Sequence, residues 1–495
     1  DSGWGQIPVV NPESGRVIGI VTRTDLLKTL TQQSDFPQPK NLANRLETAL
    51  PPARLRLLRS VAQAAYEHHA ALYIVGGFVR DMLLDRPSFD FDLVVEGDAI
   101  QLANSLAEKF GGRVTSHSRF GTSKWHIADH KIELLKNLES EIPVNREHGD
   151  TTISEPQLSQ EDLPESLDLI TARTEFYTYP SALPTVERGS IKLDLHRRDF
   201  TINTLALRLD GYHYGELHDY WGGLNDLNSG LIRVLHSLSF VDDPTRMLRA
   251  VRFEQRFNFQ IEDRTRELIN GAIRLLERVS GDRIRHELDH ILTENQADKM
   301  LARLDGLQLL KAIQRNLKWD DWLSERIRSL VEISPEPEWR LEAEHDKLRV
   351  NLGYIIWLLR ITPTRTGRVI KRLKMPRKLA DDIFSAQDIW QDINSLNKMK
   401  PSQIVIRLAG IEPLAIYANY LASDDEKVRQ IFWNYVSKWR QVFPKTDGYI
   451  LQQLGIPPGP IYRQILQTLR SAWLDGTIGS LEEEESLLEE LLPHK

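Results

Sequence analysis

Residues 73–92 constrain the fold most, because they combine a di-glycine turn, an arginine and two spaced carboxylates in one short stretch. The run Tyr73-Ile74-Val75 is typical of a strand. Gly76 and Gly77 let the backbone approach a ligand that a Cβ would exclude. The residues that follow predict a helix, so Arg80 would lie near a helix N-terminus, where anions are favoured. The segment therefore predicts a strand, a turn able to hold a phosphate, and a helix.

Asp90 and Asp92 lie on either side of Phe91, directly before the apolar run Leu93-Val94-Val95. In a strand, the period of two residues turns both carboxylates to one face and Phe91 to the core. Two carboxylates on one face are hard oxygen ligands that suit Mg²⁺, and substrate phosphates complete its shell. Each motif also occurs alone on ordinary loops and turns. Their order in one segment favours a site for a nucleoside triphosphate and Mg²⁺.

The composition excludes several classes of protein. The 495 residues are enough for three or four domains. Cysteine is absent, which excludes a disulfide framework and suits a reducing cytoplasm. No apolar run reaches about 18 residues, so no membrane contact is expected. The formal net charge of −7 means that nucleic-acid binding would need local basic surfaces. The acidic run Glu482–Glu485 predicts only a solvated helix face.

Residues 5–30 predict a strand, a glycine-containing turn, a second strand and a helix beginning near Thr22. This stretch resembles the last part of a CBS module, which implies that Thr22 and Asp25 would face the phosphate and ribose of a nucleotide. Because the match covers only about half of what the module needs, we expect a chain cut from a longer protein. Such a half-module would not bind an adenosine ligand by itself. Residues 31–41 are expected to be a linker.

Hydrophobic spacing predicts an α+β fold with a small head, followed by a long helical part. Residues 136–166 are polar and acidic without a sustained period, which predicts a mobile insertion. After about Thr201 the spacing is helical to the end of the chain. The elements expected in the head are helices at 42–69 and 99–110, strands at 113–116, 123–127 and 131–135, and a further strand from Asp168.

A second cluster, from Asp194 to Asn203, concentrates charged and amide groups where an apolar helix is expected at residues 205–207. Arg197 or Arg198 could neutralise a phosphate oxygen. Asp199 could hold the arginines in place or accept from a ribose hydroxyl. The alternative is a structural salt-bridge network that caps a helix.

A third cluster runs from Asp242 to Arg256, where an aspartate and Pro244 predict the start of a helix. At about 100° per residue, its four arginines fall within a stripe roughly 120° wide. With little acid to balance it, such a stripe favours binding of an anion. Asp243 and Arg246 lie at the leading end, where they could meet a base edge. The alternative pairs the arginines with acids of a neighbouring helix, such as Glu277 or Glu287. The four arginines are Arg246, Arg249, Arg252 and Arg256.

Five ordered motifs resemble the bacterial-type (class II) tRNA nucleotidyltransferase and poly(A) polymerase family. The resemblance implies a polymerase-β-like nucleotidyltransferase head, a mixed sheet with helices, followed by an all-α neck, body and tail. The motifs are GGFVRD at 76–81, DFD at 90–92, RRDFTIN at 197–203, WGGLNDLNSGLIR at 221–233 and DDPTRMLRAVRF at 242–253. The expected domains are a CBS remnant at 1–30, a linker at 31–41, a head at 42–210 with the insertion 136–166, a neck at 211–300 and an RNA-binding body and tail at 301–495.

The resemblance also implies roles for individual residues. Asp90 and Asp92 would bind two Mg²⁺ ions. Asp168 would be the third acidic strand residue, with Glu133 as the competing candidate. Asp243 and Arg246 would read the incoming base, and Arg249 and Arg252 would complete the pocket. The remaining nucleotide-binding residues expected are Gly76, Gly77, Arg80, Arg197, Arg198, Asp199 and Asn203.

Two features narrow the expected activity: the first favours addition of only part of the CCA end, and the second favours a tRNA enzyme over a poly(A) polymerase. The base-reading motif begins Asp242-Asp243 rather than Glu-Asp, and residues 113–127 lack the arginine-rich strand usual in poly(A) polymerases of the family. The expected activity is template-independent addition of the terminal A, or of C and A, to the tRNA acceptor end from ATP, or CTP and ATP, with release of pyrophosphate. A poly(A) polymerase and a nucleotide-sensing or RNA-binding protein with an inactive head are the alternatives. The sequence leaves the oligomeric state open.

A local basic run predicts an RNA-binding surface in the helical part. The alternative is an ordinary solvated helix face. Its residues are Arg365, Arg368, Lys371, Arg372, Lys374, Arg377 and Lys378.

Overall fold

The structure is a computed structural model, and it describes residues 6–12, 14–22, 40–86, 92–140, 158–176 and 185–492. The chain divides into two compact units. The first unit comprises residues 1–174, 186–197 and 203–221. The second unit comprises residues 175–185, 198–202 and 222–495. No helix in the described ranges is both long enough and apolar enough to cross a bilayer.

The chain begins with an antiparallel hairpin of β1 (Gln6–Val10) and β2 (Val17–Thr22). These are the two strands predicted for the CBS-like segment. The helix predicted after them, with Asp25, and most of the linker lie outside the described residues.

A seven-stranded mixed sheet forms the centre of the first unit. Its order is β11-β10-β3-β4-β7-β6-β5. Only β4 and β7 run parallel among these neighbours, and the other pairs are antiparallel. The strands are β3 (Ala71–Val75), β4 (Asp92–Glu96), β5 (Arg113–His117), β6 (Thr122–His126), β7 (Ser166–Thr171), β10 (Ala206–Arg208) and β11 (Leu217–His218). A separate two-stranded sheet pairs β8 (Arg173–Phe176) with β9 (Thr185–Arg188).

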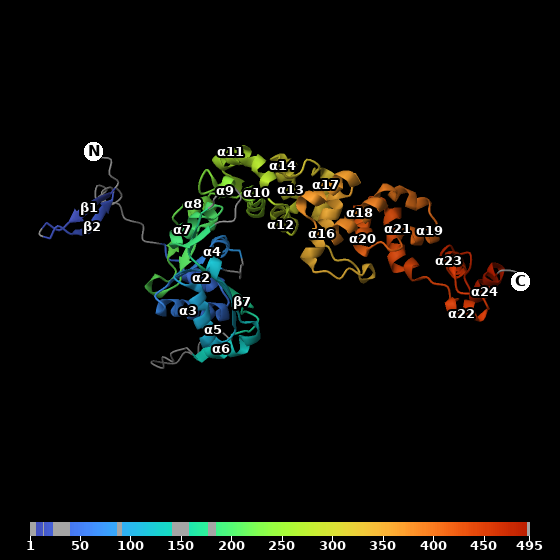
Figure 1. Cartoon of the computed structure of the whole chain (residues 1–495), viewed down its shortest axis with the longest axis horizontal. Coiled ribbons are helices and arrows are strands. Elements are labelled where there is room, and N and C mark those ends of the chain that lie inside the picture. Colours follow the sequence, from blue (N-terminus) through green and yellow to red (C-terminus); the bar gives the residue numbers. More distant parts are fainter. Residues whose placement is uncertain are drawn as a thin grey trace. The chain divides into compact units, whose positions relative to one another are not determined.

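Helices cover both faces of this sheet. α3 (Pro52–Glu67) and α5 (Ala99–Phe110) pack on one face (Figure 1). The Ala99 amide of α5 donates to Thr171 Oγ1 of β7 at 3.1 Å, so Thr171 points toward this face. α7 (Ile191–His196) packs with Tyr73, Val75 and Val94 on the opposite face. Because strand side chains alternate, Asp168 of β7 shares that opposite face with Val94.

Three local predictions for the head were wrong or incomplete. Residues 131–135 lie in α6 (Lys131–Ser140), not in a strand, and Leu134 and Leu138 are buried one helical turn apart. Residues 205–207, expected as a helix, belong largely to β10, which pairs with β3. The predicted helix at 42–69 is two helices, α2 (Ala43–Ala49) and α3, with Leu50 and Pro51 between them. Short apolar runs do not distinguish a strand from a helix.

The predicted insertion 136–166 therefore begins inside α6 and ends where β7 starts. Residues 141–157 lie outside the described residues.

The second unit is almost entirely helical, as predicted. Among its described residues, the strands are the short parallel pair β12 (Leu231–Ile232) and β13 (Gln260–Ile261), together with the end of β8 and the first residue of β9. The helices up to the tail are α8 (Gly223–Asn228), α9 (Ser239–Asp242), α10 (Arg246–Phe257), α11 (Asp263–Ala272), α12 (Gly281–Leu292), α13 (Ala297–Gly306), α14 (Leu309–Ile313), α15 (Asp321–Ser329), α16 (His345–Leu358), α17 (Pro363–Leu373), α18 (Arg377–Gln391), α19 (Pro401–Leu408), α20 (Pro413–Ala422) and α21 (Glu426–Ser437).

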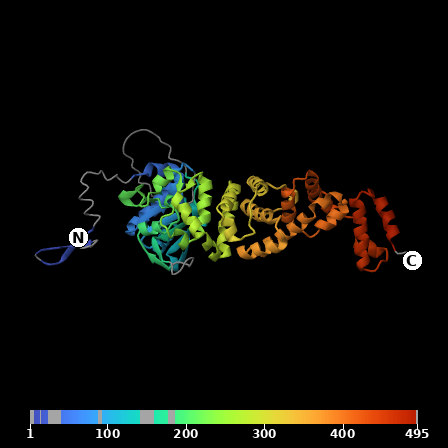
Figure 2. The ribbon, with the colours of Figure 1, turned by 90° about the horizontal axis from the view of Figure 1, so that it is seen from above.

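Three helices at the end of the chain share a small core of their own. They are α22 (Gly448–Gln453), α23 (Pro460–Leu474) and α24 (Leu481–Leu491). Leu451, Ile465, Leu469 and Leu488 are buried among them. Figure 2 shows these helices, in red, lying beside one another.

Glu484 anchors this tail, so the prediction that residues 482–485 form only a solvated face was wrong for it. Its side chain is 1% exposed. One carboxylate oxygen accepts from the Thr446 amide at 2.7 Å and from Thr446 Oγ1 at 2.6 Å, and the other accepts from Trp473 Nε1 at 2.5 Å. Burial alone would raise the pKa of Glu484, but these hydrogen bonds outweigh it and lower the pKa.

Replacing Glu484 by Gln should destabilise the tail by about 1–3 kcal/mol, because buried donors lose a charged acceptor. The lowered pKa means that the stabilisation is fully present above the ordinary glutamate pKa and is lost as the pH falls through the lowered value. Amide hydrogen exchange in α22 and α24 measures this effect. The difference in amide exchange rate between the wild type and Glu484→Gln should be large at neutral pH and should shrink below about pH 4. The exposed neighbour Glu485→Gln is the matched control and should change exchange little.

Candidate active site

The di-glycine turn connects β3 to α4 (Gly77–Leu83). Gly76 has a φ of 69°, a left-handed conformation that favours glycine, and its amide donates to the Leu205 carbonyl at 2.9 Å. Gly77 has no such constraint. A Cβ there would meet only Arg80 Nη2, at an ordinary 3.6 Å. The fold therefore does not itself require glycine at position 77, which is consistent with the close approach of a ligand.

Arg80 is held more firmly than the sequence predicts. It is 5% exposed, and its guanidinium forms a two-point pair with Asp81, Nε to Oδ1 at 2.8 Å and Nη2 to Oδ2 at 3.0 Å. Its Nη1 donates to Asn203 Oδ1 at 2.5 Å. The structure thus joins the first and second motifs through Arg80 and Asn203, and it fixes the guanidinium behind the turn.

The motif expected to bind metal leads into β4. Asp92 is the first residue of this strand and is exposed, whereas Asp90 lies outside the described residues. Leu93 pairs with Leu169 in the parallel β4–β7 ladder, so Asp92 and Asp168, one position earlier on each strand, are neighbours on one face. Lys124 Nζ of β6 lies 3.2 Å from Asp168 Oδ2. This register supports Asp168 rather than Glu133, which is exposed on α6.

This pair of carboxylates fits a hard divalent cation. Neighbouring strands are about 4.8 Å apart, so the two carboxylates are close enough to share one bound cation. Lys124 pairs only with Asp168 among the ion pairs described. Among the described residues, no three acidic, histidine or cysteine side chains gather into a metal site. A complete Mg²⁺ site would therefore need Asp90 in addition to Asp92 and Asp168.

The second cluster falls into two groups. Arg197 pairs with the buried Asp194 of α7, Nη2 to Oδ1 at 2.9 Å, which matches the alternative of a structural salt bridge. Asp199 is 4% exposed, and its Oδ2 lies 2.5 Å from Arg249 Nη2 of α10. Arg198 precedes it and is half-buried. Asp199 and Arg249 therefore connect the second and third motifs within the second unit.

The arginine stripe of α10 has more acidic partners than the sequence predicts. Besides Asp199 for Arg249, Glu294 lies 3.4 Å from Arg256 and Glu287 lies 3.8 Å from Arg252. The alternative pairing with Glu287 is therefore correct, and the expectation of an unbalanced stripe was wrong. The sequence could not show this, because the partners come from distant segments.

Arg252 is less well compensated than Arg249. The nearby Asp199 carboxylate raises the pKa of Arg249. Burial instead lowers the pKa of Arg252, whose acidic partner Glu287 is 3.8 Å away. Burial also raises the pKa of Glu287 itself. A phosphate arriving at Arg252 would thus supply charge that the protein provides only in part.

The two residues expected to read the base, Asp243 and Arg246, are held in place by residues that sequence reasoning missed. Asp243 Oδ1 accepts from the Thr245 amide at 2.9 Å and from Thr245 Oγ1 at 2.7 Å. Arg283 Nη2 of α12 lies 2.7 Å from the same oxygen. Arg246 is 6% exposed and donates from Nη1 to Ser239 Oγ at 2.6 Å. Arg283 lies in a charged segment that opens a helix, but no sequence pattern indicates that Asp243 is its partner.

The predicted basic run separates into paired and unpaired residues. Arg372 donates to the carbonyls of Ile313, Val279 and Leu276, and Lys374 Nζ pairs with Asp282 at 2.8 Å. Both side chains therefore hold helices together and do not belong to the surface predicted to bind RNA. Arg377 pairs with Asp381 at 3.8 Å. Arg365, Arg368 and Lys371 are exposed on α17 and form no ion pair within the described ranges. We call these three residues the α17 cation row.

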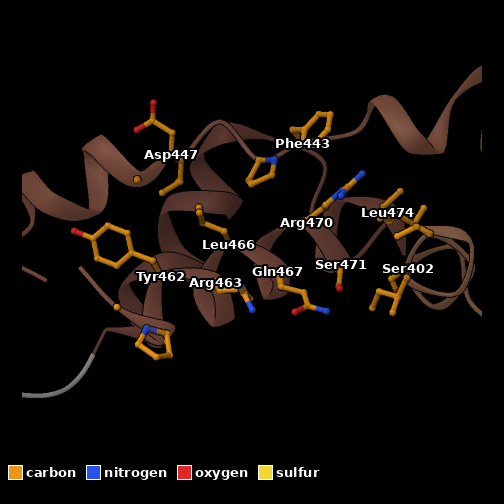
Figure 3. A pocket seen from close by; sticks show the side chains of 18 residues that line it. Ser402, Phe443, Asp447, Tyr462, Arg463, Leu466, Gln467, Arg470, Ser471 and Leu474 are labelled. Carbon is orange, nitrogen blue, oxygen red and sulfur yellow. The ribbon is translucent and has the colours of Figure 1, made fainter. Parts of the chain in front are cut away.

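A cavity of about 1030 Å³ lies among α19, the segment before α22, and α23 (Figure 3). Figure 3 shows Arg463, Leu466, Gln467 and Arg470 of α23 along it. Its lining is mostly apolar and includes a single acid, Asp447. None of the five motifs contributes to this cavity, so it is not the candidate active site.

Known protein families match three segments of the chain. Residues 72–233 match the family described as "Poly A polymerase head domain". Residues 258–319 match the "Probable RNA and SrmB- binding site of polymerase A". Residues 1–32 match the CBS domain, which confirms the expected CBS fragment.

Curated relatives match almost the whole chain. An A-adding tRNA nucleotidyltransferase of Geobacter sulfurreducens is 32% identical over 97% of this chain and 53% of its own length. One of Halalkalibacterium halodurans is 30% identical over 92% of this chain and 96% of its own length. The chain thus spans about half the length of the Geobacter protein and nearly all of the Halalkalibacterium protein.

Solved structures match over similar lengths. The apo form II of a CCA-adding enzyme has a TM-score of 0.74 at 30% identity, covering 91% of this chain and 98% of that one. The Thermotoga maritima CCA-adding enzyme complexed with tRNA has a TM-score of 0.68 at 29% identity, with the same coverage. Complexes of a CCA-adding enzyme with ATP and with CTP also match, with TM-scores of 0.69 and 0.70. The order of the five motifs, the mixed sheet of the head and these matches agree, and the chain belongs to the family of tRNA nucleotidyltransferases and poly(A) polymerases.

Proposed function

We propose that the protein adds the terminal A to tRNA from ATP, without a template, and releases pyrophosphate. One observation carries this proposal: a relative named as an A-adding tRNA nucleotidyltransferase matches from end to end, over 92% of this chain and 96% of its own. The Asp242-Asp243 start of the base-reading motif supports addition of A alone.

Asp90, Asp92 and Asp168 would hold two Mg²⁺ ions, which would neutralise the triphosphate and activate the RNA 3′-hydroxyl. The remaining contributions come from the protein. Gly77 lets the backbone approach the phosphates, and Arg80, fixed by Asp81 and Asn203, keeps the shape of that turn. Positioning and charge neutralisation would supply most of the rate enhancement.

The second unit would choose the base and bind the RNA. Asp243 and Arg246 present hydrogen-bonding groups at the start of α10, and Arg249 and Arg252 add positive charge. Because these groups are fixed to one helix, they can select a base without a template. The α17 cation row supplies exposed positive charge for the RNA backbone.

Incubation with tRNA ending in no C, one C, two Cs or CCA, with each NTP in turn, tests this proposal. We expect one nucleotide to be added, only from ATP and only to tRNA ending in two Cs. Addition of C to shorter ends from CTP would identify a CCA-adding enzyme. A long ladder of A would identify a poly(A) polymerase, and no product with any substrate would favour an inactive head.

A further inference from the structure

A second, smaller cavity lies in the second unit, where α16 ends and α17 begins. Its volume is about 370 Å³, within the range of a small-ligand site. The polar residues that line it are Asn316, Lys318, Asp320, Arg360, Thr362 and Arg365. It is lined by none of the residues assigned above to the nucleotide site. We call it the α17 cavity.

The cavity carries excess positive charge. Its single acid, Asp320, is already engaged, because Oδ1 accepts from the Leu323 amide at 3.0 Å and Oδ2 pairs with Arg360. Lys318 and Arg365 form no ion pair with any described residue. Three cationic side chains thus face a space that holds one carboxylate, and an anion would balance them.

The walls of the cavity are rigid. Trp357 Nε1 donates to the Lys318 carbonyl at 2.9 Å, which fixes the loop that carries Lys318. Gln387 Nε2 donates to the carbonyls of Leu358 and Ile361, both at 2.6 Å, and so holds the turn between α16 and α17. The Arg360 guanidinium stacks over the Trp322 ring at 4.0 Å. The Arg360 charge and the main chain of the walls are therefore held in place before a ligand binds, which reduces the entropy lost on binding.

Asn316 provides a donor that lacks an acceptor. Its Nδ2 is buried and has no hydrogen-bond partner among the described residues. A buried donor without a partner is unfavourable. The excess positive charge of the lining is what points to a ligand with anionic oxygens.

The positive charge continues outside the cavity. Arg368 and Lys371 follow Arg365 at three-residue intervals on α17, so the three side chains are neighbours along the helix surface. A mononucleotide would need only the cavity. A row of cations that extends beyond it suits a polyanion with repeated phosphates.

We propose that the α17 cavity binds one backbone phosphodiester of the RNA substrate and that the α17 cation row continues this contact along the strand. The proposal rests on the proposed function, because it takes RNA as the substrate. It adds a fixed anchoring point in the helical part, distinct from the groups that choose the base.

Binding of tRNA across a range of salt concentrations tests the proposal. In Arg365→Gln and Lys318→Gln, the affinity for tRNA at low salt should fall by about 5–10-fold. The plot of the logarithm of the binding constant against the logarithm of salt concentration should become less steep by about 0.7–0.9, for the lost phosphate contact. Arg365→Lys keeps the charge and should retain most of the slope. Arg377→Gln, which removes an exposed arginine outside the cavity, should leave the slope unchanged.

Two further measurements, A addition by the wild type and binding of ATP alone, separate this proposal from the proposed function. Wild-type protein that binds tRNA and adds A, together with an Arg365→Gln slope equal to that of wild type, would overturn the cavity proposal alone. Absence of tRNA binding by the wild type would overturn the proposed function as well. The binding of ATP alone is compared between the wild type and Arg365→Gln. If Arg365→Gln weakens it, the cavity is a mononucleotide site and the phosphodiester assignment is wrong.

Discussion

Replacing Asp92 by Asn should lower the rate of A addition by about 10³-fold or more, which corresponds to roughly 4 kcal/mol of lost transition-state stabilisation. Asp92 opens β4 next to Asp168 of β7, so its neutral variant would leave a cation with one charged ligand fewer. Single-turnover incorporation of radiolabelled ATP into tRNA ending in two Cs measures the effect.

The matched control for Asp92→Asn is Asp129→Asn, an exposed aspartate of the same unit in the 3₁₀ turn before α6. It should keep full activity, and both variants should keep the wild-type circular dichroism and tRNA affinity.

Asp168→Asn and Glu133→Gln form a second pair of variants, which identifies the third carboxylate. Only Asp168→Asn should reduce the activity strongly. An Asp92→Asn enzyme with near-normal rates would show that the metal is held elsewhere.

Replacing Asp199 by Ala should lower the free energy of unfolding by about 3–5 kcal/mol, because it leaves Arg249 partly buried without its partner. The Asp199 side chain is 3% exposed, and its Oδ2 lies 2.5 Å from Arg249 Nη2. The adjacent Asp199 Oδ1 accepts from the Phe200 amide at 2.8 Å, so a main-chain donor also loses its acceptor. Urea unfolding followed by tryptophan fluorescence measures the change.

Replacing both partners separates the loss of the ion pair itself from the cost of leaving Arg249 without its partner. Asp199→Leu combined with Arg249→Met replaces the pair by apolar groups of similar size, so the double variant should recover much of the stability lost in Asp199→Ala. Arg264→Gln, which removes an exposed pair with Glu267 on α11, should cost about 1 kcal/mol at most. A similar loss in Asp199→Ala would mean that the pair contributes little.

The di-glycine turn and the strand that follows it could be predicted from sequence because their signals are local. The turn, Arg80 and Asp92 lie within one strand–helix–strand unit, but the pairing of Arg80 with the distant Asn203 could not be read from their spacing. Asp168 was identified correctly as a strand residue, but only the parallel pairing of β4 with β7 shows that it lies beside Asp92.

The charge balance of the arginine helix could not be predicted, for the opposite reason. The partner of Arg249 is Asp199, fifty positions earlier, and the partner of Arg252 is Glu287 on another helix. No periodicity within α10 contains this information. The same limit explains β10, whose three residues become a strand only because β3, more than a hundred residues earlier, offers an edge with which they pair.

The ion pair between Asp243 and Arg283 has a consequence for fidelity. The carboxylate oxygen that would meet a base already accepts from Thr245 and lies 2.7 Å from a guanidinium nitrogen. If Asp243 reads the base as proposed, an incoming base would compete with an internal partner, and the energy available for selection would be the difference between the two sets of hydrogen bonds. A base that matches poorly would not displace Arg283. Discrimination between bases would then depend on the strength of the Asp243–Arg283 pair as much as on the affinity for ATP.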